Sequence, residues 1–579
     1  MMKNLISKSA IMIVAFILTA LCVQSQTVKN NNTEGSKWWK EAIVYQIYPR
    51  SFKDSDGDGI GDLKGIISKL DYLKSLGITA VWLNPIYGSP NDDNGYDISD
   101  YQNIMKDFGN MADFDLLLKG LHQRNIKLVM DLVVNHSSDE HEWFKQSKSS
   151  RTSPYRDYYH WWNAEKGKPN YRWSFFDVNS DAWMYDSTTN AYYLHYFSRK
   201  QPDLNWENPT LRQEIYKVMK FWLNKGIDGF RMDAFQYVAK DTTFPALPGG
   251  FEKNIIKYYG MGPHLHDYLQ EMNKEVISKY DVMTVAEGAG STFEDAHLLI
   301  DKERKELNMA YHFEGMDIGA DGKGYSLLDF KKVYTRWDSA FATNGWLSIF
   351  LGNHDVPRMV SKYGNDSAEF RASSSKMLTT FIMTMRGTPY YYNGDELGMS
   401  NVNFDKIEDY QDISFLNAYK NVQNKGGDVN QFIQSQKKLS RDNCRTPFQW
   451  DSTKNAGFTT GKPWLKVNAN YTTVNESAEV KDANSVLNYF KKVVKLRKEN
   501  KVLVYGKYTL LDKNNPDVYA YTRELDGQKI LVLLNFKSKI SNTNIGLNLN
   551  KATVLLGTNA RPSKDGTLQP YEAVIYKLN

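Results

Sequence analysis

Four short segments of this sequence end in side chains that could perform nucleophilic or acid–base chemistry. The segment 226–233 (GIDGFRMD) places Arg231 and Asp233 two residues apart. Side chains two residues apart share one face of a strand, and a guanidinium beside a carboxylate favours its ionised, nucleophilic form. Similar polar strand ends occur at 131–136 (DLVVNH), 284–287 (TVAE) and 352–355 (GNHD).

Two carboxylates with different roles are the minimum for cleaving a glycosidic bond. Beside its arginine, Asp233 is expected to stay ionised and to attack the anomeric carbon. Glu287 has less charged neighbours, so its pKa should be raised and it could protonate the leaving oxygen. Asp355 could orient the sugar ring through its hydroxyls, and His136 and His354 are suitable hydrogen-bond donors.

Each of these segments also has a plain structural explanation. An Asn-His pair can be a turn, an Arg-x-Asp pair can be a salt bridge, and Glu287 can be an ordinary surface residue. Function is favoured because all four segments fall at predicted strand ends, in order along the chain.

Apolar runs typical of buried strands alternate with amphipathic helical patterns from about residue 41 to 397. The candidate strands are 42–48, 80–84, 127–135, 229–234, 282–287, 309–313, 347–352 and 389–392. The helical patterns include 63–76, 111–124, 211–224, 269–279 and 370–385. This alternation predicts an α/β fold, a closed parallel (β/α)8 TIM barrel with its site at the strand C-termini. An open doubly wound sheet is disfavoured because no glycine-rich phosphate loop follows the first strand.

The spacing of these elements predicts several domains. About ninety residues separate strands three and four, far more than one crossover helix needs. The tail alternates like an antiparallel β structure. The predicted division is 1–26 signal peptide, 38–136 barrel, 137–205 inserted domain, 206–500 barrel and 501–579 C-terminal β-sandwich-like domain.

The N-terminus predicts a secretory signal, with Lys3 and Lys8 before the apolar run 11–23. This run is short for a transmembrane helix, which needs about 20 apolar residues, so no stable membrane insertion is expected. An uncleaved anchor and lipidation at Cys22 are the weaker alternatives, the latter because the preceding Leu21 is large. A secreted, periplasmic protein is therefore predicted.

The composition excludes some classes of function. The 579 residues carry 72 Lys+Arg against 67 Asp+Glu, a net charge of +5. This near balance, without a basic stripe, argues against a nucleic-acid binder. Cys444 would be the only cysteine left after signal removal, so no intrachain disulfide is expected and a structural role is favoured.

An acidic loop at 54–62 (DSDGDGIGD) could bind a hard cation, because carboxylates at alternate positions can surround it with oxygen ligands. A solvated acidic turn is the alternative. The loop is not a helix–loop–helix calcium hand, because Gly65 stands where a bidentate glutamate would be. The predicted ligands are Asp54, Asp56, Asp58, Asp62 and the carbonyl of Ile60.

From about Trp38 to its C-terminus the chain resembles the α-amylase family of glycoside hydrolases, within its oligo-1,6-glucosidase and α-glucosidase branch. The motifs that carry the resemblance are 131–136, 229–233, Glu287, 353–355, 201–205 (QPDLN), 441–450 (RDNCRTPFQW) and 455–461 (NAGFTTG).

The resemblance implies a retaining mechanism with Asp233 as nucleophile, Glu287 as acid/base and Asp355 as transition-state stabiliser. It also implies structural Ca²⁺ in the acidic loop, and a terminal-glucose pocket whose far end is closed by Asp93 and Arg445, so that the enzyme acts from non-reducing ends. The implied pocket residues are Asp93, Tyr96, His136, Arg231, His354 and Arg445.

The residue after the nucleophile indicates the linkage. In related enzymes a valine there tends to accompany α-1,6 cleavage, whereas Ala234 favours α-1,4-linked maltose and short maltooligosaccharides. The stretch 288–290 (GAG) after Glu287 departs from the family pattern. An oligo-1,6-glucosidase, a trehalose-type hydrolase and a transglucosylase are the alternatives on this scaffold. A non-catalytic sugar-binding protein and a metal-dependent hydrolase are more remote ones.

Overall fold

The computed structural model describes residues 37–402 and 404–578. The chain divides into two compact units, 1–41 and 42–579, and helix α2 (Trp38–Glu41) belongs to the first. The predicted signal peptide, including Cys22, lies outside the described residues. Among the helices of the described part, none combines the length and the apolarity that crossing a membrane requires.

Eight parallel strands form the barrel of the second unit, in the order β11-β10-β9-β5-β2-β1-β13-β12. A parallel bridge between Ala310 and Leu347 joins the two ends of this order, so the sheet closes. The predicted (β/α)8 fold is therefore confirmed. The strands are β1 (Val44–Ile47), β2 (Ala80–Leu83), β5 (Lys127–Val133), β9 (Gly229–Asp233), β10 (Met283–Glu287), β11 (Met309–Tyr311), β12 (Ser348–Ile349) and β13 (Thr388–Tyr392).

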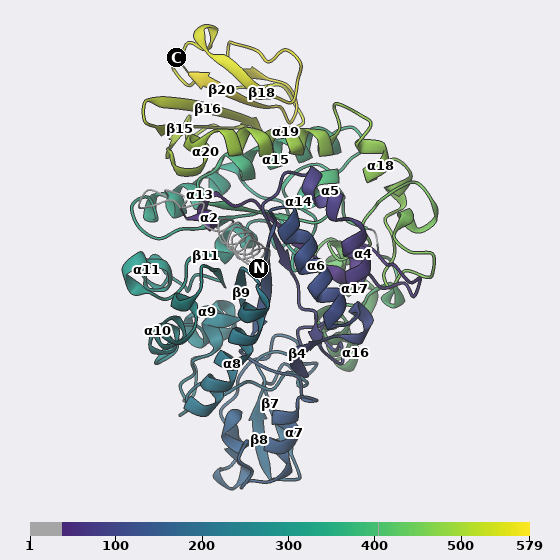
Figure 1. Ribbon diagram of the computed structural model, residues 1–579, viewed down its shortest axis with the longest axis vertical. Helices are drawn as coiled ribbons and strands as arrows, with labels where there is room; N and C mark the ends of the chain where they lie inside the picture. Colours follow the sequence, from purple (N-terminus) through teal and green to yellow (C-terminus); the bar gives the residue numbers. More distant parts are fainter. Residues whose placement is uncertain (1–36, 403, 579) are drawn as a thin grey trace, which may run out of the picture. The chain divides into compact units, whose positions relative to one another are not determined.

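Helices cover the outside of the barrel, and α6, α8, α10, α11, α13 and α15 follow one another around it in Figure 1. The predicted helix 63–76 is two helices, α4 (Leu63–Ser68) and α5 (Leu70–Ser75), which meet at Lys69. The other helices of eight or more residues are α6 (Met111–Gln123), α7 (Glu142–Ser149), α8 (Pro209–Lys225), α10 (Leu265–Glu275), α11 (Phe293–Ile300), α13 (Leu327–Ala340), α15 (Arg371–Thr384), α16 (Ile413–Asn424), α17 (Val429–Gln436) and α19 (Val486–Glu499).

Capping residues at both ends of α8 explain where this helix begins and ends before strand β9. Asn208 caps its first turn by accepting from the Thr210 amide, and Pro209 occupies the first helical position. Gly226 ends the helix in the left-handed conformation, with φ of 105°, which glycine adopts without steric cost. The chain then enters β9, all five residues of which are buried.

The stretch between β5 and β9 forms a small antiparallel sheet of its own, in the order β6-β8-β7. It occupies the end of the second unit at the bottom of Figure 1, together with α7. Its strands are β6 (Trp161–Asn163), β7 (Trp183–Asp186) and β8 (Ala191–Leu194). The exact division into 137–205 and its flanking barrel segments stays a prediction.

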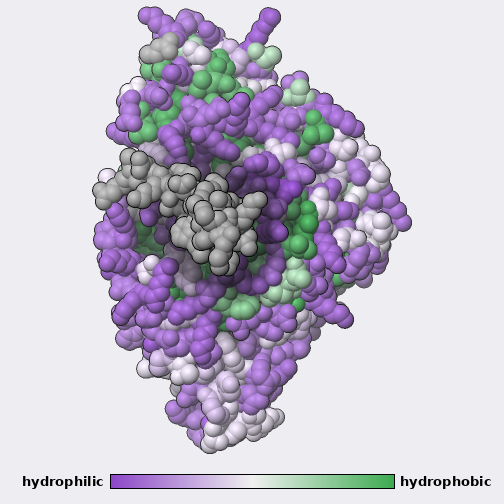
Figure 2. Space-filling model, viewed as in Figure 1, coloured by the Kyte–Doolittle hydropathy of each residue, from purple (hydrophilic) through white to green (hydrophobic). Residues whose placement is uncertain are grey.

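An antiparallel five-stranded sheet follows the barrel, in the order β14-β15-β16-β20-β18, which confirms the predicted C-terminal β structure. The strand 507–511 was not among the expected ones. The face in Figure 2 is largely hydrophilic, with green apolar patches over this C-terminal part. The strands are β14 (Lys507–Leu511), β15 (Val518–Leu525), β16 (Gln528–Asn535), β18 (Thr553–Gly557) and β20 (Ala573–Leu578).

Candidate active site

One buried guanidinium lies at the C-terminal ends of four neighbouring barrel strands. Arg231 Nη1 is 2.7 Å from Asp131 Oδ1 and also contacts the Asp233 carboxylate. Nη2 of the same group contacts Glu287 and lies 3.0 Å from the Tyr311 hydroxyl oxygen. Three carboxylates far apart in the sequence therefore converge on one cation.

Strand register explains this convergence. Asp131 of β5 pairs with Arg231 of β9, and Glu287 of β10 pairs with Tyr311 of β11. Gly229 permits the close approach of β9 to β10, because a Cβ atom there would lie 2.1 Å from the Met283 carbonyl oxygen. Side chains at the ends of these parallel strands consequently share the mouth of the barrel.

The electrostatics differ from the expectation that Arg231 simply keeps Asp233 ionised. Burial raises the pKa of Asp233 well above its usual range; the Arg231 charge opposes this shift, while Glu287 and Asp131 add to it. Burial also raises the pKa of Asp131 to about 6, against the effect of the same guanidinium. One arginine cannot fully compensate the buried Asp131 and Asp233, so these two carboxyl groups titrate together and bind protons more tightly than isolated ones.

The Glu287 carboxylate is held next to the Asp233 strand end. Its Oε2 accepts a hydrogen bond of 2.7 Å from the Ala234 amide. Ala234 has φ of 45°, a left-handed conformation that is uncommon for a residue with a Cβ and that occurs at functional sites. This turn directs the amide after Asp233 towards Glu287, which brings the two carboxylates of the predicted pair together.

His354 stacks on Tyr96, with ring centroids 5.2 Å apart and 3° between the planes. Its Nε2 lies 2.7 Å from the Tyr96 hydroxyl oxygen and 3.1 Å from Asp355 Oδ2. Its Nδ1 lies 2.8 Å from the side-chain nitrogen Nε2 of Gln46, and this nitrogen can only donate. Burial lowers the His354 pKa well below its usual value, so the ring is neutral with its proton on Nε2.

Asp355 lies between two arginines of the 441–450 motif. Its Oδ1 is 3.1 Å from Arg441 Nη1 and 3.0 Å from Arg445 Nη2. Burial alone would raise the pKa of Asp355, but His354, Arg441 and Arg445 lower it below its usual range. Asp355 is therefore ionised throughout the neutral range.

Cys444, which lies between the two arginines in the sequence, is buried, and burial raises its pKa to about 12, which fits a structural thiol.

Asp93 lines the pocket and contacts the inserted segment. Its Oδ2 accepts from Gln201 Nε2 at 3.1 Å, and its Oδ1 lies 3.6 Å from Arg441 Nη2. Burial raises its pKa to about 7. Among the described residues, Asp93 Oδ1 and Arg445 Nη1 have no hydrogen-bond partner. Such orphaned buried groups are suited to bind sugar hydroxyls.

A pocket of about 70 Å³ brings most of the predicted site residues together. Arg231 and Arg445 are absent from its lining: Arg231 lies behind Asp233, and Arg445 lies behind Asp355. The lining residues are Asp93, Tyr96, His136, Phe176, Phe197, Asp233, Ala234, Glu287, His354, Asp355 and Arg441.

Several residues of the site were not assigned from the sequence. Asp131 and Arg441 lie inside recognised motifs, so their positions were available but their roles were not. Phe176 and Phe197 come from the inserted segment, and the Arg441 guanidinium lies 4.8 Å from the Phe176 ring. No local pattern marked these two aromatics, because their place in the pocket depends on how the insertion docks.

The acidic loop has the chemistry of a cation site over part of its predicted length. Carboxylate oxygens of Asp54, Asp56 and Asp58 lie within 4.8 Å of one another, and carboxylate oxygens are the ligand type that a hard divalent ion prefers. Asp62 instead caps α4 by accepting from the Gly65 amide at 2.7 Å. Asp54 also accepts from the Thr459 hydroxyl, so the loop docks onto the 455–461 motif.

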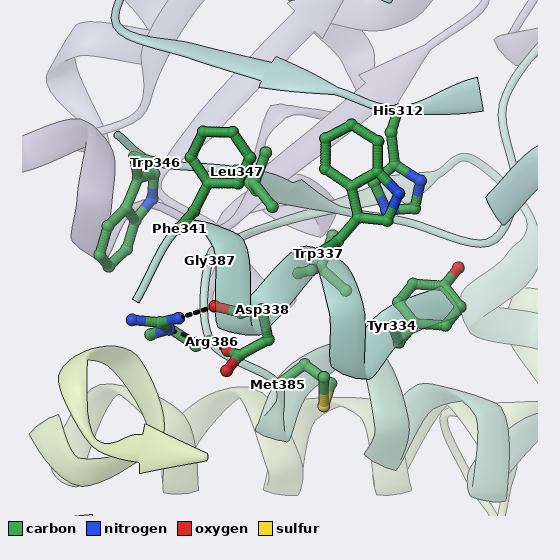
Figure 3. Close-up of a pocket in the computed structure, with 11 residues that line it drawn as sticks. His312, Tyr334, Trp337, Asp338, Phe341, Trp346, Leu347, Met385, Arg386 and Gly387 are labelled. Atoms are coloured by element: carbon green, nitrogen blue, oxygen red, sulfur yellow. Dashed lines mark hydrogen bonds and ion pairs between the residues drawn. The ribbon is translucent and has the colours of Figure 1, made fainter. Parts of the chain in front are cut away.

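A separate gap of about 20 Å³ lies between α13, β12 and the segment 385–387 that precedes β13 (Figure 3). His312 stacks on Trp337 there, with ring centroids 4.3 Å apart, and Arg386 Nε lies 2.9 Å from Asp338 Oδ1. The volume is that of a water-sized void, so this gap cannot hold a sugar.

Comparisons with known proteins agree with this geometry. The family model described as "Alpha amylase, catalytic domain" matches residues 46–506, and "Maltogenic Amylase, C-terminal domain" matches 508–575. The chain is 51% identical over 560 residues to an oligo-1,6-glucosidase of Parageobacillus thermoglucosidasius, covering 93% of this chain and 99% of that one. It is 44% identical to an alpha-glucosidase of Pediococcus pentosaceus, with 94% and 99% covered. The structure of an isomaltulose synthase from Protaminobacter rubrum matches with a TM-score of 0.90 and 45% identity, over 94% and 100% of the two chains.

Proposed function

Because this chain belongs to the α-amylase family and is a glycoside hydrolase, we propose that it is a retaining α-glucosidase that releases glucose from non-reducing ends. The observation that carries this proposal is the convergence of Asp233 and Glu287 on the two terminal nitrogens of Arg231. A nucleophile and an acid held this near each other fit double displacement, which needs a short separation of the carboxyl groups.

In this mechanism, Asp233 attacks the anomeric carbon while Glu287 protonates the departing oxygen. Glu287 then removes a proton from the water that hydrolyses the glycosyl-enzyme, which restores both groups. Asp355, kept ionised by its arginines, stabilises the positive charge that develops on the sugar ring.

The far end of the pocket supports exo action. Arg441 bridges Asp93, Asp355 and Asp412, at 3.6 and 3.1 Å from the first two. This ion-pair network closes the pocket behind a single sugar unit.

The linkage is proposed to be α-1,4, because Ala234 lines the pocket beside both carboxylates and leaves more room than a valine would. The name of the 51%-identical relative favours α-1,6 as the second candidate.

Initial rates on maltose, isomaltose, trehalose and sucrose separate these possibilities. We expect the highest kcat/KM on maltose. Ala234→Val adds two carbon atoms to the pocket wall and should raise the isomaltose-to-maltose ratio at least about tenfold. Wild-type enzyme that prefers isomaltose would contradict the α-1,4 proposal and leave the mechanism intact. Transfer products from sucrose would identify a transglucosylase.

The acidic loop is proposed to hold Ca²⁺ through Asp54, Asp56 and Asp58, supported by Asp62 and the Ile60 carbonyl. The ion would neutralise clustered carboxylates and rigidify the first βα loop, without contacting the reacting sugar.

Removal of the ion should therefore lower the melting temperature while leaving kcat at 25 °C unchanged. Binding to the native state alone stabilises it by mass action, so Ca²⁺ added to chelated enzyme should restore the melting temperature. Asp56→Asn should weaken this response. Loss of activity in chelated enzyme that is still folded would instead support a metal-dependent hydrolase.

We also propose that the protein is exported to the periplasm or the medium, on the basis of the leader 1–26. N-terminal sequencing of enzyme recovered outside the cytoplasm tests this, and a chain that retains Met1 there would contradict cleavage.

A further inference from the structure

A buried lysine outside the recognised motifs lies directly behind the sugar pocket. Lys240, in the loop after β9, is 4% exposed. Its Nζ donates to Asn135 Oδ1 at 3.0 Å and to the Tyr237 carbonyl oxygen at 2.7 Å, and it lies 3.2 Å from Asp203 Oδ2. Lys240 therefore makes two hydrogen bonds and one ion pair, all of them with buried groups.

The contact with Lys240 sets the orientation of the Asn135 amide. An ammonium has no lone pair and can only donate, so the amide oxygen must face Lys240. The amide nitrogen then faces the other way, 3.2 Å from His136 Nδ1 and 3.4 Å from Asp203 Oδ1. His136 Nδ1 therefore accepts a hydrogen bond and carries no proton.

The surroundings of the other ring nitrogen, His136 Nε2, do not by themselves decide whether it carries a proton. Nε2 lies 3.1 Å from the Tyr96 carbonyl oxygen, which requires a proton on Nε2. It also lies 3.2 Å from Gln201 Nε2. That nitrogen is a donor, because Gln201 Oε1 accepts from the Ser198 amide, so it would favour an unprotonated ring nitrogen. The pocket side alone does not determine the tautomer.

We propose that Lys240 is a positioning residue that, through Asn135, holds His136 in its Nε2–H tautomer, so that the Nε2 proton can be shared between the Tyr96 carbonyl oxygen and a hydroxyl of the bound glucosyl unit. This inference rests on the proposed function for the identity of the ligand. Burial lowers the His136 pKa to about 3, so the ring stays neutral at working pH and its tautomer matters.

These contacts of Lys240, Asn135 and His136, here called the relay, also connect the inserted segment to the sugar pocket. Asp203 belongs to the 201–205 motif and forms a bridge pair with His136, and its carboxylate pairs with Lys240. A loop of the barrel and a loop of the insertion thus meet at one ion pair, and the tautomer of a pocket residue depends on both.

Two variants test the relay by opposite chemical means. Asn135→Asp keeps a partner for Lys240 but presents a carboxylate oxygen to Nδ1, which forces a proton onto it. Lys240→Met removes the donor that orients the amide. In ¹⁵N-histidine-labelled protein, wild-type His136 should show the Nε2–H pattern and both variants the Nδ1–H pattern. His136→Gln assigns the signal among the ten histidines.

Both variants should raise KM for maltose about tenfold with a smaller change in kcat, the size expected for one lost hydrogen bond to the substrate. Lys331→Met is the matched control: Lys331 is 1% exposed and donates to the Asp512 and Asn515 carbonyl oxygens, remote from the pocket. It should leave the tautomer and KM unchanged.

Wild-type enzyme with an Nδ1–H ring, or an Asn135→Asp variant that keeps Nε2–H, would overturn the relay. Asn135→Asp retains the buried ion pair, so it remains decisive if Lys240→Met does not fold. The tautomer is read without substrate. A protein that shows the predicted tautomers but hydrolyses no α-glucoside would refute the proposed function and leave the relay standing.

Discussion

Asp233→Asn should lower kcat by at least about 10⁴-fold on every substrate, as expected when a covalent nucleophile is removed. The asparagine oxygen can still accept from Arg231, so the site geometry should persist. Steady-state hydrolysis of maltose, with a release assay for glucose, measures the loss. Binding of glucose should change little, because the ground-state contacts of the pocket remain.

The Asp233→Asn variant should lose activity without losing stability. Burial raises the pKa of Asp233, and an acid whose pKa rises on folding holds its proton more tightly in the native state. The free energy of unfolding therefore falls as pH increases from the unfolded pKa, about 3.9, towards the native pKa. Asp233→Asn lacks this contribution, so it should be at least as stable as wild type at pH 7 and lose any advantage below about pH 4.

Asp338→Asn is a matched control for this result. The Asp338–Arg386 pair drawn in Figure 3 is also largely buried and lies 2.9 Å apart, but its arginine serves one carboxylate. Its removal should lower the melting temperature and leave kcat unchanged. If Asp233→Asn unfolded the protein while active molecules kept their turnover, Asp233 would be a structural partner of Arg231 and the mechanism would be wrong.

Glu287→Gln should lower kcat on maltose by about 10²- to 10⁴-fold, the usual contribution of a general acid–base group. The loss should depend on the leaving group. The acidic phenol of an activated aryl α-glucoside can leave without being protonated, so formation of the glycosyl-enzyme should remain fast. A burst of phenol should then precede slow turnover.

An added small anion distinguishes the role of Glu287 from that of Asp233. Azide needs no general base, so it should accelerate turnover of Glu287→Gln on the aryl substrate and give an α-glucosyl azide, because it displaces Asp233 from the β-linked glycosyl-enzyme. In a variant without the Asp233 carboxylate, azide would instead displace the phenol directly from the α-glucoside and give a β-linked azide. No acceleration by azide, together with an equal loss on both substrate types, would show that Glu287 is not the acid/base.

Much of the fold followed from local pattern. All eight predicted strands occur in the barrel, because strands buried on both faces are continuous apolar runs, and a polar residue directly after such a run marks the strand end. The insertion was detectable because its length exceeds that of a crossover. Strand β14 was missed, since its five residues include the exposed Lys507 and Thr509 and resemble the end of the preceding helix.

The candidate site was predictable in membership and less so in electrostatics. Asp233 and Glu287 end their strands as predicted, whereas Asp355 lies in the loop after β12, which ends at Ile349, and all three line one pocket. That Arg231 serves three carboxylates was not visible, because Asp131 and Glu287 lie 100 and 56 residues from it in the chain and meet it only through strand register.

Periodicity and polar strand ends establish the barrel and name the side chains at its mouth, because these features depend on contacts with near neighbours in the chain. Charge states, the closed end of the pocket and the Lys240–Asn135–His136 relay come from segments that are distant in sequence. They are established only when the strands take their register and the insertion docks against the barrel, since burial and the sharing of one cation among several carboxylates are properties of the assembled fold.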